Sequence, residues 1–131
     1  MPKKGKTPVN DCPCGSGVSL SGCCGPLLDG DWCAPTAEAL MRSRYTAFVF
    51  GDRGYLERTW HSATQPRSVS IDPAVKWVGL RIVERAGGGE ADAEGEVAFV
   101  ARYKVGGRAG CLEERSRFRR ENGEWRYLDG E

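Results

Sequence analysis

Four cysteines close to the N-terminus form the pattern with the clearest chemistry in this sequence. They are Cys12, Cys14, Cys23 and Cys24, spaced as Cys-x-Cys, eight residues and then Cys-Cys. Two close pairs of thiolates joined by a short loop can supply the four tetrahedral ligands that Zn²⁺ prefers. Four thiolates would close the coordination shell and leave no position for a reacting water. The pattern therefore predicts one structural zinc ion.

The same cysteines could also serve other chemistry. Disulfides need an oxidising compartment and a defined Cβ geometry, which adjacent cysteines meet poorly. An iron–sulfur cluster or a redox-active thiol pair would use the same kind of ligand. The spacing favours zinc and leaves cluster or redox chemistry as the alternative.

Two further cysteines, Cys33 and Cys111, lie outside this pattern. A closed zinc site takes four ligands, so neither is needed, although Cys33 is near enough in the sequence to substitute. A cysteine without a ligand role is commonly a small buried hydrophobe, and we predict that role for both.

The charge balance argues against a dedicated nucleic-acid binder. Among the 131 residues, 19 Lys and Arg face 18 Asp and Glu, for a formal net charge of +1, whereas such binders carry a clear basic excess. Lys3, Lys4 and Lys6 could instead screen the charge of the thiolates. They lead into no apolar segment, and no apolar run approaches a membrane span. We expect a cytoplasmic protein that binds no membrane.

A helix is predicted between Thr36 and Gly51. Thr36 is a good N-cap residue, Glu38 lies in the first turn, where the helix dipole favours an acid, and Gly51 is typical of a helix end. Apolar side chains recur at helical spacing and predict a buried stripe of Leu40, Met41, Tyr45, Phe48 and Val49. The residues Arg42, Ser43 and Thr46 fall outside that stripe.

A second, short helix is predicted from Asp52, and strands follow a loop over residues 61–74. Alternating apolar residues predict strands within 77–83, 97–103, 112–118 and 125–128. Asn122-Gly123 is a strong signal for a two-residue hairpin. Residues 26–35 are expected to form a linker or packed loop. The order of elements predicts an α+β fold with helices packed on an antiparallel meander.

The segment from Asn10 to Gly25 resembles the SEC-C zinc-binding motif, whose pattern is Cys-x-Cys, eight residues and then Cys-Cys or Cys-His. That resemblance implies the same four zinc ligands. Further blocks of the chain are similar to the YchJ-like family of bacterial proteins. These blocks are residues 40–48, 55–61, 77–80, 97–103, 114–118 and 125–130.

The family resemblance implies two parts. Residues 1–34 would form the zinc knuckle with its linker, and residues 35–131 a cone-shaped domain of the kind named after nuclear transport factor 2. Such a fold wraps helices around a curved antiparallel sheet. The family has no agreed biochemical activity, so the resemblance specifies the fold and the metal more closely than the role.

A concave sheet can host a small-molecule pocket. The candidate pocket residues are Arg44, Tyr45, Trp60, His61 and Glu114. His61 is the sole histidine and could act as an acid or base, or simply cap a helix end. We also expect Arg42 or Arg44 to point into the cone and pair with Glu114 or with an anionic ligand. The run from Glu113 to Arg120 alternates charges in a way typical of the solvated face of a strand.

These observations lead to two hypotheses about function. The first is an adaptor or protein-interaction module that contains a structural zinc and recognises a protein partner. The alternative is a small-molecule binding protein or enzyme that uses the pocket of the cone. We expect a binding protein rather than an enzyme, and we assign no catalytic residue.

Overall fold

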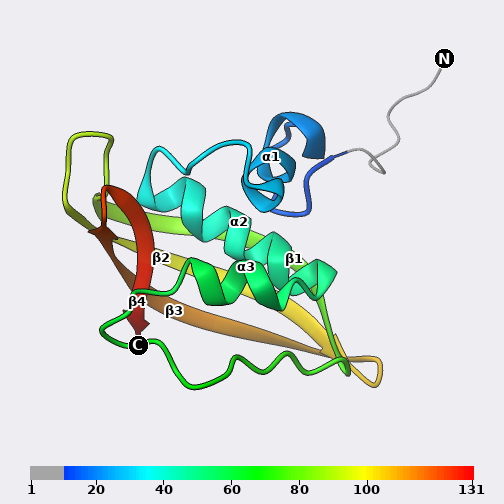
Figure 1. Ribbon diagram of the computed structural model, residues 1–131. Coiled ribbons are helices and arrows are strands. Elements are labelled where there is room, and N and C mark those ends of the chain that lie inside the picture. The colour runs from blue at the N-terminus through cyan, green and yellow to red at the C-terminus, as the bar shows by residue number, and fades with distance from the viewer. Residues whose placement is uncertain (1–10) are drawn as a thin grey trace, which may run out of the picture.

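The structure is a computed structural model, and it describes residues 11–131. Helices lie across one face of a four-stranded antiparallel sheet, so the fold has two layers (Figure 1). The predicted α+β class is confirmed. Lys3, Lys4 and Lys6 lie outside the described residues.

The helices confirm the predicted boundaries at two points. The side chain of Thr36 accepts a hydrogen bond from the Ala39 N–H at 3.1 Å, and Gly51 ends the long helix with φ of 73°. The side chain of Asp52 caps the next helix by accepting from the Tyr55 N–H at 3.0 Å. The helical segments are η3 (Leu20–Gly22), α1 (Cys24–Asp29), α2 (Ala37–Phe50) and α3 (Arg53–Arg58).

The helix α1 corrects the prediction of a linker over residues 26–35. It begins at Cys24, inside the cysteine pattern, and continues through Pro26 to Asp29. Proline is tolerated in the first turn of a helix because the N–H that it lacks would have no partner there. Six residues are too few to show helical periodicity, so the sequence pattern did not reveal this helix.

The helix α2 is buried on more sides than the single apolar stripe predicted. Ser43 and Thr46 lie outside that stripe and are nevertheless fully buried. The Ser43 hydroxyl donates to the Leu40 carbonyl at 2.8 Å and bonds the Tyr55 hydroxyl at 2.7 Å, so its polar atom is satisfied inside the protein. The reason is that α2 packs against the sheet as well as against α1 and α3.

The sheet is the predicted meander, with strands in the order β1-β2-β3-β4. The Asn122-Gly123 turn between the last two strands has φ of 54° and 83°, which suits a tight hairpin. On the edge strand β1, register shifts leave Val78 and Val83 without a partner, and both are exposed. The strands are β1 (Val75–Gly87), β2 (Glu94–Val105), β3 (Arg108–Glu121) and β4 (Glu124–Gly130).

The two faces of the sheet differ in polarity. The outer face carries the expected ion pairs, including Arg115 with Glu96 at 3.0 Å and Arg117 with Asp129 at 2.6 Å. These exposed pairs each contribute little to stability. The inner face and the helices enclose the core, whose largest fully buried side chain is Trp125.

We expect Thr36→Ala to lower the free energy of unfolding by about 1 kcal/mol, because the substitution removes the side-chain cap of α2. Urea denaturation followed by circular dichroism measures this change. Ser70→Ala, at an exposed loop position, is the matched control and should leave the midpoint unchanged. Equal midpoints for the two variants would show that the cap contributes nothing.

Candidate functional site

The structure brings the sulfur atoms of Cys12, Cys14, Cys23 and Cys24 within 4.8 Å of one another. The Sγ atoms of Cys14 and Cys23 are 3.6 Å apart, and those of Cys23 and Cys24 are 3.9 Å apart. In a tetrahedral site with Zn–S bonds of roughly 2.3 Å, neighbouring sulfurs lie about 3.8 Å apart. The donor set therefore fits one four-thiolate metal ion. A closed shell of this kind supplies structure rather than reaction chemistry.

Short backbone contacts hold the two pairs of cysteines together. The Cys12 N–H donates to the Val18 carbonyl at 2.9 Å, and Asp11 forms a β-bridge with Ser19, so the chain doubles back between the pairs. The second pair is fixed by the start of α1 at Cys24. Three of the four thiols are buried, whereas Cys23 is half-buried.

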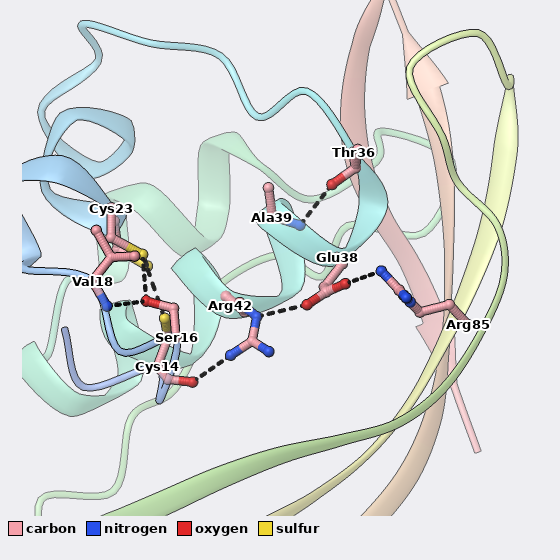
Figure 2. Close-up of polar contacts among 10 residues, drawn as sticks. Cys14, Ser16, Val18, Cys23, Thr36, Glu38, Ala39, Arg42 and Arg85 are labelled. Carbon is pink, nitrogen blue, oxygen red and sulfur yellow. Dashed lines mark hydrogen bonds and ion pairs between the residues drawn. The ribbon is translucent and has the colours of Figure 1, made fainter.

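Groups around the thiols come from both the loop and α2. The Ser16 hydroxyl lies 3.1 Å from the Sγ of Cys23, and the Thr46 hydroxyl lies 3.7 Å from the Sγ of Cys12. The guanidinium of Arg42 donates through Nη1 to the Cys14 carbonyl at 2.7 Å (Figure 2). Arg42 therefore brings a positive charge to the cysteine cluster, a role that was expected of Lys3, Lys4 and Lys6.

A chain of ion pairs connects Arg42 to the sheet (Figure 2). Its Nε donates to Glu38 at 2.8 Å, and the other oxygen of Glu38 accepts from Arg85 of β1 at 2.6 Å. Burial opposes the charge of Glu38, but the bonds from the two arginines outweigh it and hold the pKa of Glu38 below its usual value. The cluster, α2 and the edge strand are thus linked by charged hydrogen bonds.

Without a metal ion, repulsion between negative charges would prevent all four thiols from being ionised at such short separations. Hydrogen bonding, first from Cys12, lowers the pKa of Cys14 and raises that of Cys24. Burial raises the pKa of Cys23. Cys14 can hold a negative charge while Cys23 and Cys24 keep their protons, so binding of a divalent ion would displace those protons.

The candidate pocket residues separate into two groups. Arg44, Tyr45, Trp60 and Glu114 line one cavity between α2 and the inner face of the sheet. His61 does not line it, because its side chain is held locally. The side-chain Nδ1 accepts from the Ala63 N–H at 3.0 Å, and the backbone N–H of His61 donates to the Tyr127 carbonyl at 2.8 Å.

Arg44 points into the cone and is only 5% exposed. Its Nη1 donates to the Leu56 carbonyl at 2.9 Å and to the Thr59 hydroxyl at 2.7 Å. Burial lowers the pKa of Arg44 to about 10, which leaves the side chain protonated at neutral pH. The expected pairing with Glu114 is not formed, since Arg44 takes part in none of the ion pairs found within residues 11–131.

The predicted burial of Cys33 and Cys111 was wrong. Both are exposed, and neither belongs to the four-cysteine group. Cys33 lies in the segment after α1, with its Sγ 3.6 Å from Glu124. Cys111 lies on β3 opposite Arg102, on the outer face of the sheet, so strand alternation carries its side chain away from the core.

Among the helices of the described residues, none has the length and hydrophobicity of a membrane span.

Known proteins resemble this chain in both sequence and fold. The family model described as "YchJ, middle NTF2-like domain" matches residues 36–130. A UPF0225 protein from Streptomyces coelicolor is 51% identical over 124 residues, which cover 95% of this chain and 97% of that protein. Another, from Chromobacterium violaceum, is 51% identical over 123 residues, covering 91% of this chain and 90% of that one.

Two solved structures are similar along almost the whole chain. The solution structure of a SEC-C motif containing protein from Rhodopseudomonas palustris has a TM-score of 0.82 and 35% identity, and the match covers 92% of this chain and 96% of that one. The crystal structure of a SEC-C motif containing protein from Psychrobacter arcticus has a TM-score of 0.76 and 27% identity, with 92% and 81% covered.

The fold and the site together define a class of bacterial proteins in which a SEC-C cysteine cluster packs on a domain like nuclear transport factor 2. The chain belongs to the YchJ-like family, whose curated members carry the designation UPF0225. The predicted family membership is confirmed.

After loading with Zn²⁺, we expect Arg42→Gln to release the ion at about tenfold lower concentration of a competing chelator than wild type, because the variant lacks the cation bonded to the Cys14 carbonyl. A titration with a chromogenic chelator measures this loss. Arg85→Gln is the matched control, since it removes the other partner of Glu38 without touching the cysteines. Indistinguishable curves for the two variants would show that Arg42 does not support the metal.

Proposed function

We propose that this protein is an interaction module whose N-terminal segment is held in shape by one structural zinc ion. The observation that supports the proposal most directly is the gathering of four sulfur atoms within 4.8 Å, three of them on buried residues. With four thiolates bound, the ion has no vacant position, so its contribution would be to order residues 11–24. A cytoplasmic location would keep the thiols reduced and available as ligands.

The loop between the cysteine pairs is the surface that such a module would present to a protein partner. Residues 15–19 are all exposed, and the Val18 side chain is 47% exposed. The Val18 N–H donates to the Ser16 hydroxyl at 3.2 Å, so the tip of this loop, residues 15–19, has a defined local conformation. A small apolar contact on a rigid tip loses little conformational entropy when it docks, which favours recognition.

The helix α2 and the sheet behind it would hold this tip in a fixed orientation. Cys12, Cys14 and Cys24 belong to the same apolar cluster as Leu40 and Tyr45 of α2. The bond from Arg42 to the Cys14 carbonyl fixes the direction of the loop relative to that helix. A partner that contacts the tip would therefore meet a surface with a fixed relation to the sheet.

Native mass spectrometry should find one zinc ion per chain, and Cys14→Ser should lose it. On chelation, hydrogen exchange should rise over residues 11–24 because they lose their metal crosslink, whereas β2 and β3 should stay protected by their own ladder and core. Cys111→Ser is the matched control, since this exposed cysteine lies outside the cluster. Unchanged exchange in residues 11–24 after complete metal removal would contradict a structural role.

We expect Val18→Asp to abolish capture of the partners that bind the tip, because a charge would replace the apolar contact. Affinity capture with chemical crosslinking, read out by mass spectrometry, compares wild type, Val18→Asp and Val105→Asp. Val105 is a matched control because it is 40% exposed and lies at the end of β2, outside the metal segment. Identical partner sets for all three baits would overturn the proposal, provided that each bait retains its zinc.

A further inference from the structure

The cavity between α2 and the inner face of the sheet has no part in the proposed interaction role. Its volume is about 160 Å³, and a protein cavity of about 150 Å³ is large enough to hold benzene. Aromatic side chains form much of the wall, among them Phe48, Trp60, Trp77, Phe99 and Tyr127. The size and the lining suit a ligand built on one planar ring.

The guanidinium of Arg44 lines this cavity with two of its five N–H donors engaged. Nη1 is satisfied by the Leu56 carbonyl and the Thr59 hydroxyl. Within residues 11–131 no group accepts from Nε or Nη2, and no fully buried side-chain nitrogen there lacks a partner. These two nitrogens are therefore accessible, and the cavity is the space on which Arg44 borders.

Nε and Nη2 form one edge of the guanidinium, and that edge matches the two oxygens of a carboxylate. The plane of the group is held by aromatic rings, since its Cζ lies 5.2 Å from the centre of Trp60 and 4.6 Å from that of Tyr127. Arg44 also joins no direct ion pair within the described residues, although the charge of Glu114 acts on it from a greater distance. A carboxylate on its free edge would therefore gain a direct ion pair.

Glu114 limits how many negative charges the ligand can carry. It lines the same cavity, and its Oε2 accepts from the Ser116 hydroxyl at 2.7 Å. The carboxylate packs against Gly130, where even a Cβ atom would collide with it. A second carboxylate on the ligand would be repelled by Glu114, whereas a hydroxyl or amino substituent could donate to it.

We propose that this cavity binds a small planar molecule with a single carboxylate, whose oxygens accept from Nε and Nη2 of Arg44 while its ring lies among the aromatic walls. The ligand class follows from three features of the cavity. They are the unbonded Nε and Nη2 of Arg44, the volume and aromatic lining, and the carboxylate of Glu114. This proposal goes beyond the interaction role proposed above and does not rest on it.

Titration of the full-length, zinc-loaded chain with benzoate tests the proposal, with tryptophan fluorescence or NMR shifts as the readout. Benzoate should bind saturably. Benzamide, which has the same shape without the charge, should bind at least about tenfold more weakly. Isophthalate, with a second carboxylate, should also bind more weakly than benzoate. Equal binding of benzoate and benzamide, tighter binding of benzylamine, or no saturable binding of benzoate up to about 10 mM would each overturn the proposal.

Two variants assign the effect to the named residues. Arg44→Lys keeps the charge but loses the paired donors, so benzoate should bind at least about tenfold more weakly. Glu114→Gln should retain benzoate and reduce the discrimination against isophthalate; unchanged discrimination would contradict the role given to Glu114. Arg81→Lys, at an exposed position on β1, is the control and should match wild type. If thermal melting shows that Arg44→Lys does not fold, the ligand series on wild type and Glu114→Gln decides the question.

Discussion

The crowding of four sulfur atoms against one helix is the constraint on which the arrangement of this protein depends. Four thiolates carry more negative charge than one divalent ion neutralises, and three of the four cysteines are buried. Buried charge is tolerated only where neighbouring groups compensate it. Here α2 supplies those groups through Arg42, which bonds the Cys14 carbonyl, and Thr46, which lies beside the Cys12 sulfur. The cysteine segment is therefore chemically part of the body on which it packs.

The same helix also borders the cavity, and its geometry explains how. Residues two apart on an α-helix point in directions about 200° apart. Arg42 and Arg44 consequently face opposite sides, the first toward the cysteines and the second toward the sheet and Tyr127. Because neighbours lie on both sides, α2 is not a simple amphipathic helix. Two arginines that look equivalent in the sequence have different environments and different chemistry.

The features that the sequence predicts well are those fixed by local spacing. Three such features depend on residues within a few positions of one another. They are the proximity of Cys12 to Cys14, the cap at Thr36 and the hairpin at Asn122. The meander could also be predicted, because each strand pairs with its neighbour in the chain. The alternation of β3 also indicated the outer face for Arg115 and Arg117, which form ion pairs there.

The features that the sequence did not predict depend on contacts between distant segments. The bond between Arg42 and Cys14 joins residues 28 positions apart, and no local pattern indicates it. The burial of Ser43 depends on α3, whose Tyr55 supplies its partner. The position of Cys33 after α1 was also not predicted, because this helix is too short to leave a periodic signal. His61 is the exception, because the side-chain bond that holds it is to the Ala63 N–H, two residues away in the local turn.

The shared use of α2 has an energetic consequence. Cys12, Cys14 and Cys24 lie in the same apolar cluster as Met41 and Tyr45, and these last two also line the cavity. A metal that ordered the cysteine segment would therefore also restrain one side of the cavity wall. Because linkage between binding equilibria is reciprocal, any coupling that α2 carries from the cavity to the metal would act with the same free energy in the other direction. In a chain of this size the two sites have one helix in common, and a change in the packing of α2 reaches both.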